Sequence, residues 1–377
     1  MRQWILGIGI LVVTGFGVWY GLELRARSWE GKWRAFVNQW EAKGESFGVE
    51  ENLPATMADD DEFASHPWIR RIAADDPEVL ERLREMEPET VAGYPEWQAT
   101  EAAEDVAAPM PVELAERLRK HAAGFRQELD AFADALRRPG CRISPVDAEG
   151  SPTFAGWVKQ LTPLCHLLEG LSHAAIAMDD STAFTEAIEI SLRAGEKLRA
   201  SNVMLPVVVG CGFEVAAYQS LRSVPVPDVW TRDEPLKWMA ALDYRRRSLE
   251  DEYVAVARAE RGLFLGIFAK LEKAPAGEAA IPRFDLLRRV FIARAKLTPC
   301  EAMQGMLLAA GGKMGAPVDL ERIARFETYS GHKRHKSDPA LDFGLWMLVG
   351  ARRGIHAALL VQESDRAAIR KKLSEAR

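Results

Sequence analysis

Cysteine, glutamate and histidine, residue types that bind zinc or form a reactive thiol, recur at helical spacing near the middle of the chain. Cys165, Glu169 and His173 are four residues apart, so a helix would place all three along one face. Such a set could hold a metal ion or activate the thiol for nucleophilic attack. Leucines at 164, 167, 168 and 171 share the segment, and a buried structural cysteine explains the pattern as well. We favour this structural interpretation.

A second candidate for chemistry is the carboxylate of Glu260. It falls on an apolar helical stripe that includes Val256 and Leu263, which predicts that the side chain points inward. A buried carboxylate needs a cationic partner, and we expect Arg261 or Arg294 to supply it. We interpret the arrangement as a structural ion pair, with a catalytic acid as the alternative.

The remaining polar motifs favour solvated surface over chemistry. Residues 331–336 read Gly-His-Lys-Arg-His-Lys, a basic loop that could otherwise meet phosphate or anionic lipid. The acidic run 59–62 lacks the glycine of a calcium-binding loop. No serine-hydrolase, zinc-protease, phosphate-loop or dinucleotide-binding motif occurs. We therefore expect no cofactor and no metal, and we favour a protein that is not an enzyme.

The composition is that of a folded protein whose main partner is not a nucleic acid. A hydrophobic content of 48% and a charged content of 28% exclude collagen-like and wholly disordered classes. The formal net charge is -6, so no basic surplus is available for wrapping nucleic acid. Because 377 residues exceed the roughly 250 to 300 that one core serves, we expect several units or an elongated stack of helices.

The N-terminus carries an uncharged, mostly apolar stretch over residues 4–22. As a helix it would extend about 28 Å, close to the hydrocarbon thickness of a bilayer. Trp4 at one end and Trp19 with Tyr20 at the other stand where aromatic side chains meet the headgroups. We interpret the stretch as a retained single-pass anchor in a cell membrane. The alternatives are a cleaved secretory signal ending near Gly17 and a buried soluble helix.

Several properties of the anchored chain stay open. Gly17 and Gly21 have the spacing of a helix-pairing motif in lipid, which permits a homodimer. Basic residues at 25, 27, 32 and 34 favour a cytoplasmic body. A span this close to the first residue is also the form of an anchor that exports the rest of the chain, and we favour the extracytoplasmic side. The cysteines at 141, 165, 211 and 300 have no CxxC spacing and leave their disulfide state open.

Composition predicts three segments. Residues 1–43 hold the anchor and a continuing helix with four aromatic residues on one face: Trp29, Trp33, Phe36 and Trp40. We expect this aromatic stripe to pack against the protein's own body, with a helix lying in the headgroup layer as the alternative. Gly44 is expected to end the helix. Residues 44–110 are acidic and rich in proline, which predicts a loosely packed connector with one short helix over about 76–86. Residues 111–377 predict a helical body.

Apolar periodicity divides the helical body. One amphipathic helix is predicted from Pro111 to about Arg138, with an apolar seam close to a heptad. Helices over 154–177 and 182–199 are joined so closely that they must be antiparallel neighbours. Phe184 and small residues at 175, 187 and 194 resemble a tetratricopeptide-type hairpin in a single copy. Further helices are predicted over 203–222, 231–273, 284–296, 300–310, 320–329, 339–360 and 363–376.

Four short stretches carry a resemblance to a family. They are Trp40-Glu41-Ala42-Lys43-Gly44-Glu45, Asp60-Asp61-Glu62-Phe63-Ala64, the hairpin around 175–198, and Ala259-Glu260-Arg261. In this order the chain resembles a large family of uncharacterised bacterial proteins built as one N-terminal span, an acidic proline-containing connector and a helical body. The Gly-x-Tyr-Pro element and strand-rich tail with which members commonly end are missing from this sequence. The resemblance implies an architecture and no activity.

The predicted fold is all-α, with an N-terminal transmembrane helix followed by an irregular helix-hairpin body of α-solenoid type. Stacked helix pairs expose elongated faces, and no converging set of polar groups is evident. We therefore expect a membrane-anchored scaffold that binds the bilayer through residues 4–22 and a protein partner through its body. The alternative is a membrane-anchored enzyme, hydrolase-like or metal-dependent, whose site forms only on folding from the low-ranked candidates Glu260, Arg261, Cys165, Glu169 and His173.

Overall fold

The computed structural model describes residues 2–103, 109–145, 153, 155–223, 249–273 and 285–309. Most of these residues are helical and none of them forms a strand, which confirms the predicted all-α class. The chain divides into two compact units. Unit 1 joins Met1–Asn52 to Tyr253–Arg352, and unit 2 joins Leu53–Glu252 to Arg353–Arg377. This division differs from the one predicted at residues 43 and 110, because contacts between distant segments define the units.

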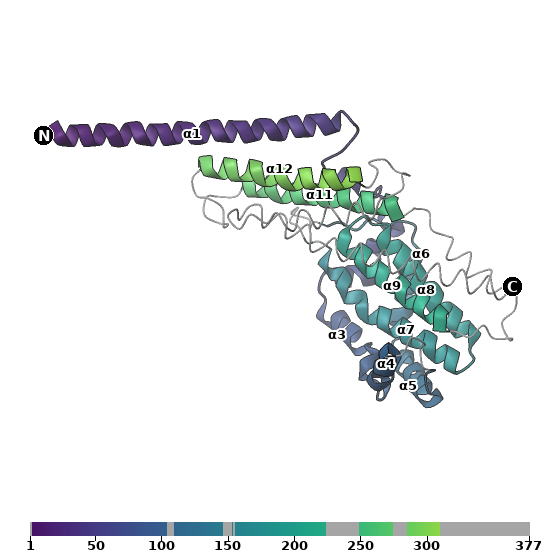
Figure 1. The fold of residues 1–377 in the computed structure, drawn as a ribbon. Helices are drawn as coiled ribbons and strands as arrows, with labels where there is room; N and C mark the ends of the chain where they lie inside the picture. Colours follow the sequence, from purple (N-terminus) through teal and green to yellow (C-terminus); the bar gives the residue numbers. More distant parts are fainter. Residues whose placement is uncertain are drawn as a thin grey trace. The chain divides into compact units, whose positions relative to one another are not determined.

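Three long helices make up most of the described part of unit 1: α1 (Arg2–Glu41), α11 (Leu249–Lys273) and α12 (Asp285–Ala309). Figure 1 shows α12 running beside the C-terminal half of α1. The aromatic stripe of α1 faces this neighbour. Phe36 is buried with Leu297 and Cys300, and the three tryptophans of the stripe pack around them. The prediction that the stripe packs against the protein's own body is confirmed.

Contacts along the helices fix their directions. Arg289 in α12 donates to Glu23 and Glu30 of α1, and farther along both helices Leu297 and Phe36 share one cluster, so α12 runs parallel to α1. Phe264 and Phe268 of α11 pack on Ile292, whereas Arg261 donates to Gln304 near the other end of α12. The α11 helix therefore runs antiparallel to α12.

The α12 helix continues through Thr298 and Pro299, where two separate helices over 284–296 and 300–310 are predicted. An interior proline removes one backbone hydrogen bond and usually ends a helix. Here Leu297 and Cys300, on either side of the proline, are both buried in the cluster with Phe36. Packing of both flanking turns against α1 holds them in line, so the prediction of two pieces is wrong.

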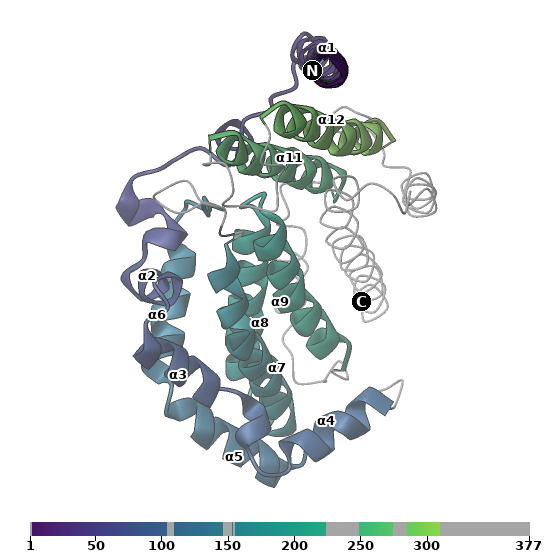
Figure 2. The ribbon, with the colours of Figure 1, turned by 90° about the vertical axis from the view of Figure 1, so that its left-hand side faces the viewer.

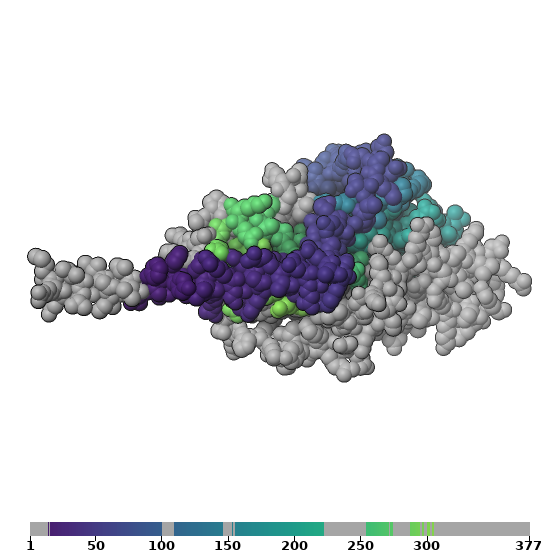
Figure 3. Space-filling model, turned by 90° about the horizontal axis from the view of Figure 1, so that it is seen from above, coloured from purple at the N-terminus to yellow at the C-terminus, as the bar shows by residue number. Residues whose placement is uncertain are grey.

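The N-terminal half of α1 differs from its docked half in exposure. Among the side chains described there, Phe16 is 65%, Trp19 50% and Tyr20 53% exposed. Phe16 contacts the rings of Trp19 and Tyr20 within the same helix. Figure 3 shows the later part of α1 in purple, lying over the green helices α11 and α12. Beyond the docked half, α1 thus presents a large apolar surface to its surroundings.

The end of α1 agrees with the prediction. Gly44 has a φ of 87°, and its N–H donates to the carbonyl of Glu41, the last residue of the helix, at 2.9 Å. A left-handed residue just beyond the last turn is the usual helix stop, and glycine adopts it without a steric penalty. The short helix η1 (Glu50–Asn52) comes next.

Residues 53–103 contradict the prediction of a loosely packed connector. They form the short helices η2 (Asp59–Asp61), η3 (Phe63–Ser65), α2 (Pro67–Ala73), α3 (Pro77–Glu85), η4 (Pro88–Thr90) and α4 (Tyr94–Ala103). Phe63, Ile69, Ile72 and Met86 are fully buried. The prolines do not prevent helix formation, because α2, α3 and η4 each begin with a proline. At the first position of a helix the missing N–H has no hydrogen-bond partner to lose. The predicted helix at 76–86 is confirmed as α3.

The amphipathic helix predicted over 111–138 is broken into α5 (Val112–Ala123) and α6 (Arg126–Arg137). The break falls at Gly124 and Phe125, where Phe125 leaves helical geometry with a φ of -122°. All the predicted seam residues are nevertheless buried: Leu114, Leu118, Ala122, Phe125, Leu129, Phe132 and Leu136. The predicted apolar pattern is confirmed, although two helices form where one is predicted.

The centre of unit 2 is built from η5 (Gly156–Leu161), α7 (Thr162–Ala177), α8 (Ser181–Arg199) and α9 (Met204–Ser223). Figure 2 shows α7, α8 and α9 side by side. The antiparallel pairing of α7 with α8 and the helix predicted over 203–222 are confirmed. Phe184 and Ile188 of α8 share a buried cluster with Ala175 of α7 and Tyr218 of α9.

Glycines bring α8 and α9 into close contact. A Cβ added at Gly195 would lie 2.9 Å from the carbonyl oxygen of Gly210, and one at Gly210 would lie 2.8 Å from that of Gly195. One turn farther along, the buried Arg199 donates to both carboxylate oxygens of buried Glu214, at 2.7 and 2.6 Å. The close crossing and the buried ion pair together fix how the two helices pack.

Among the residues whose side chains the structure describes, which leave out 1–13 and 15, the segment Met204–Leu221 of α9 is the one long and apolar enough to cross a membrane. Because 61% of this segment is buried inside the protein, it has the character of a core helix. In this structure none of the four cysteines, at 141, 165, 211 and 300, forms a disulfide bond. The predicted start of the helix at 231–273, the helices beyond 309 and the basic loop 331–336 lie outside the described residues.

Candidate functional site

The set predicted from sequence, Cys165, Glu169 and His173, lies on α7, and two of its members are shielded from solvent. Cys165 is 8% and His173 4% exposed. The His173 ring meets the Trp97 ring edge-on, with centroids 5.1 Å apart. Eight residues of helix place Cys165 and His173 about 12 Å apart along the axis, which is too far for one metal ion to bind both.

Burial also removes the reactive forms of these two groups. It raises the pKa of the Cys165 thiol, with the charges of Glu169 and Glu87 acting in the same direction, and it lowers the pKa of His173 to about 4. Near neutral pH the thiol is therefore protonated and the imidazole is neutral. Cys165 and His173 have the properties of core residues, as the structural interpretation expected.

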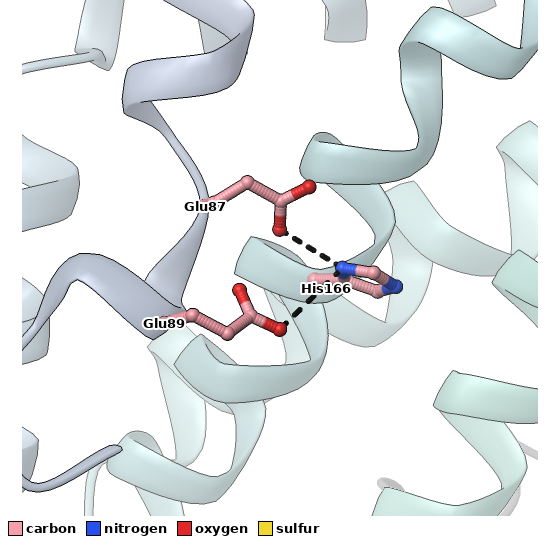
Figure 4. A group of neighbouring side chains, drawn as sticks. All are labelled: Glu87, Glu89 and His166. Atoms are coloured by element: carbon pink, nitrogen blue, oxygen red, sulfur yellow. Dashed lines mark hydrogen bonds and ion pairs between the residues drawn. The ribbon is translucent and has the colours of Figure 1, made fainter. Parts of the chain in front are cut away.

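A different group of donors comes together beside them, at Glu87, Glu89 and His166 (Figure 4). The Glu87 Oε2 atom lies 2.9 Å and the Glu89 Oε1 atom 3.9 Å from His166 Nδ1. Figure 4 shows both carboxylates directed toward the imidazole ring. All three side chains are partly exposed, so the group is open to solvent and to small solutes.

Local structure explains the placement of these side chains. Glu87 stands immediately before η4 and Glu89 inside it, while Pro88 between them is buried. The turn is closed by the hydroxyl of Thr90, which donates to the carbonyl of Glu87 at 2.8 Å. His166 lies near the start of α7, so the site joins the η4 turn to one helix.

The electrostatics of the group favour a cation. Burial raises the pKa of Glu87 and neighbouring Glu89 adds to the rise, although the hydrogen bond from His166 opposes it. Glu169, three residues after His166 on α7, has its pKa raised by burial and by the charge of Glu89. Carboxylate oxygens with one imidazole nitrogen form a donor set that suits zinc or manganese. The donor atoms of Glu87, Glu89 and His166 lie within 4.8 Å of one another.

In unit 1, Arg261 is more deeply buried than its neighbour Glu260, the predicted site residue. Arg261 is 0% exposed and Glu260 is partly buried. Glu260 lies between Val256 and Leu263 of the predicted inward stripe, which are both buried. Arg261 forms an ion pair with Glu45. Arg261 Nη2 donates to Glu45 Oε2 at 2.9 Å and Arg261 Nη1 to Gln304 Oε1 at 2.5 Å.

A second guanidinium completes this buried cluster. Arg258 donates to both carboxylate oxygens of Glu45, at 3.0 and 2.7 Å. Burial raises the pKa of Glu45, but the hydrogen bonds from Arg258 and Arg261 outweigh it and hold the pKa below its usual value. Gly262 lets the backbone approach, since a Cβ there would lie 2.7 Å from the Val49 nitrogen. The cluster has the properties of a structural tie between the segment after α1 and α11.

The chain matches no family model, no curated protein and no solved structure. The resemblance to the bacterial family of single-span proteins therefore stays a prediction. Two of its four stretches nevertheless meet in unit 1, because the first ends at Glu45 and the last at Arg261, and these residues form an ion pair.

Proposed function

We propose that this protein is a single-pass, membrane-anchored helical scaffold, with residues 4–22 in the bilayer and its helical body available to a protein partner. The observation that carries the proposal is α1, a continuous helix of 40 residues. Its exposed apolar side chains at Phe16, Val18, Trp19 and Tyr20 lead directly into a half that is docked on α12. An exposed surface of this kind is stable in lipid and unfavourable in water.

The position of the first charged residues after the apolar stretch of α1 supports the proposed membrane anchor. The helix has no charged residue between Arg2 and Glu23, and Glu23, Arg25 and Arg27 come directly after the apolar stretch. Trp19 and Tyr20, both about half exposed, stand at this boundary, where amphipathic rings favour the headgroup level. Around Gly17 and Gly21 nothing lies within 4 Å of an added Cβ, which leaves this face open for the proposed homodimer.

The packing of the helices in unit 2 supports the proposed scaffold role. The helices α7, α8 and α9 lie side by side, as in α-solenoid proteins that bind partners along extended surfaces. The cysteine and histidine that could have served an enzyme, Cys165 and His173, are buried and uncharged near neutral pH. We therefore favour binding of a protein over catalysis by these groups.

An extraction experiment tests the anchor. The full chain should stay with the membrane pellet after an alkaline carbonate wash and move to the supernatant in detergent, whereas release by carbonate would contradict the anchor.

A tag at the C-terminus, tested for protease access in intact and ruptured cells, decides on which side of the membrane the body lies. We expect the extracytoplasmic side. Capture of a stoichiometric partner from a detergent extract supports the scaffold; its absence from repeated extracts argues against it.

One observation favours a second function, that of a metal-dependent enzyme. The group of Glu87, Glu89 and His166 provides the kind of donors that the sequence pattern predicted at other positions. Metal analysis of the purified full chain tests this alternative. Stoichiometric zinc or manganese that is lost in His166→Gln and retained in the exposed control Glu85→Gln would support it, and a metal-free protein would remove it.

A further inference from the structure

The packing of unit 1 determines which side chains lie at the bilayer surface, provided that α1 spans as proposed. Residue 22 is the last of the apolar stretch, and Glu23 is the next residue. Arg289 of α12 donates to Glu23 at 3.0 Å. The first turns of α12 therefore lie level with the point where α1 leaves the hydrocarbon. Because α11 runs antiparallel to α12 and Phe268 packs on Ile292, the last turn of α11 reaches the same level.

A membrane surface acts on charges over a limited depth. The headgroup layer adds about 6 Å beyond the hydrocarbon, and a Debye length at physiological salt adds about 8 Å. At 1.5 Å per residue, this depth corresponds to about ten residues of each helix. The relevant segments are residues 23–32 of α1, 264–273 of α11 and 285–294 of α12.

These three segments, here called the basal surface, are positively charged. They hold eight basic and four acidic residues, although the whole chain has a formal net charge of -6. Two of the acids, Glu23 and Glu30, are paired with Arg289. Residues 274–284, between α11 and α12 in the sequence, contain one acidic and one basic residue. They do not change the excess of basic over acidic residues. Within the described part of unit 1, the positive charge is thus concentrated at the end that adjoins the proposed span.

Exposed side chains from two of the helices contribute to this charge. Arg25 and Lys32 are exposed on α1, and Lys273 is exposed at the end of α11. The Lys32 ammonium also lies 4.5 Å from the centroid of the Trp29 ring, which keeps the aromatic stripe next to the charged groups. A surface with basic side chains, flanked by Trp19 and Tyr20, complements phosphate groups packed in a plane.

We propose that the basal surface of unit 1 binds anionic phospholipid headgroups selectively over zwitterionic ones. The inference rests on the proposed membrane anchor and adds a lipid class to it. Each basic side chain near an anionic surface favours the anionic lipid by about fivefold, so the excess charge is sufficient for a measurable preference.

The experiment reconstitutes the full chain in phosphatidylcholine nanodiscs and compares spin-labelled phosphatidylglycerol with spin-labelled phosphatidylcholine. The measured quantity is the ratio of their association constants with the protein. We expect a ratio of about five at low ionic strength, falling toward one in 1 M salt, where the Debye length is about 3 Å. The triple variant R25Q/K32Q/K273Q should bring the ratio close to one at low salt, and all three side chains are exposed, so the fold should be retained.

A control variant removes the same charge from exposed positions of unit 2: R84Q/K120Q/R137Q. It should keep the wild-type ratio. A ratio near one in the wild-type protein, or an equal fall in both variants, would overturn the proposal. Failure of the chain to enter phosphatidylcholine membranes at all would instead overturn the anchor itself, so the two failures are distinguishable.

Discussion

At the scale of single residues, the carboxylate of Glu45 between two guanidinium groups is a demanding electrostatic arrangement. Arg261 is 0% exposed, and its charge is balanced by an acid that lies outside its own helix. Burying a guanidinium without such a partner is strongly unfavourable. Glu45 therefore holds together α11 and the segment after α1.

Replacing Glu45 with glutamine tests this role. Glu45→Gln removes the charge and keeps the shape, so we expect the free energy of unfolding in detergent to fall by about 3 to 5 kcal/mol. The control is Glu272→Gln, which affects a more exposed pair with Lys296 and should cost less than about 1 kcal/mol. Equal decreases in the free energy of unfolding in the two variants would show that the ion pairs of Glu45 stabilise the protein no more than an exposed pair does.

His173 gives unit 2 a specific dependence on pH. Burial lowers its pKa to about 4 from an ordinary 6.5, so the unfolded chain binds a proton between these values that the folded chain does not. This contribution to stability is complete above pH 6.5 and is lost as the pH falls to about 4, a change of roughly 3 kcal/mol.

The variant His173→Phe isolates this effect. Phenylalanine keeps an aromatic ring against Trp97 and cannot titrate. Denaturant midpoints measured at about pH 7.5 and about pH 4.5 should differ less for His173→Phe than for the wild type. Identical shifts in both proteins would mean that other groups carry the pH dependence.

At the scale of elements, the crossing of α8 and α9 depends on glycine. In Gly195→Ala the new Cβ would clash with Glu214 Cγ and would lie 2.9 Å from the Gly210 carbonyl oxygen. Relief of this clash must move α9 or displace Glu214 from Arg199, so we expect a loss of about 1 to 3 kcal/mol in unfolding free energy.

The partner helix α9 offers a matched control for Gly195→Ala. A Cβ added at Gly212 meets nothing within 4 Å, and alanine is the better helix former by about 1 kcal/mol. Gly212→Ala should therefore be neutral or stabilising in the same unfolding measurement. Destabilisation of both variants by the same amount would contradict the close-crossing argument.

At the scale of the whole molecule, α1 has two functions that truncation can separate. Removing residues 2–22 takes away the apolar stretch and leaves the docked stripe of Trp29, Trp33, Phe36 and Trp40. We expect this variant to be helical by circular dichroism and monodisperse without detergent.

A longer truncation should behave differently. Removing residues 2–43 also uncovers Leu297 and Cys300, which are buried against the stripe, so the chain should aggregate or lose helical signal. A well-behaved protein after the longer truncation would show that α1 is dispensable for the folding of unit 1.

Local periodicity is enough to determine the class of this fold. The structure confirms the apolar seam from Leu114 to Leu136, the stop at Gly44 and the aromatic stripe of α1, since each depends on residues within a few helical turns. One residue of helix corresponds to a rotation of about 100°, and this rotation separates the partly buried Glu260 from the fully buried Arg261.

Only the tertiary structure decided which distant residues meet. His166 pairs with Glu87 across 79 positions, and Arg261 pairs with Glu45 across 216. Helical spacing describes one helix at a time and holds no information about which helices become neighbours. The sequence therefore established helices and an apolar N-terminal segment, whereas the donor group at His166, the buried tie at Glu45 and the proposed basal surface depend on how the helices pack.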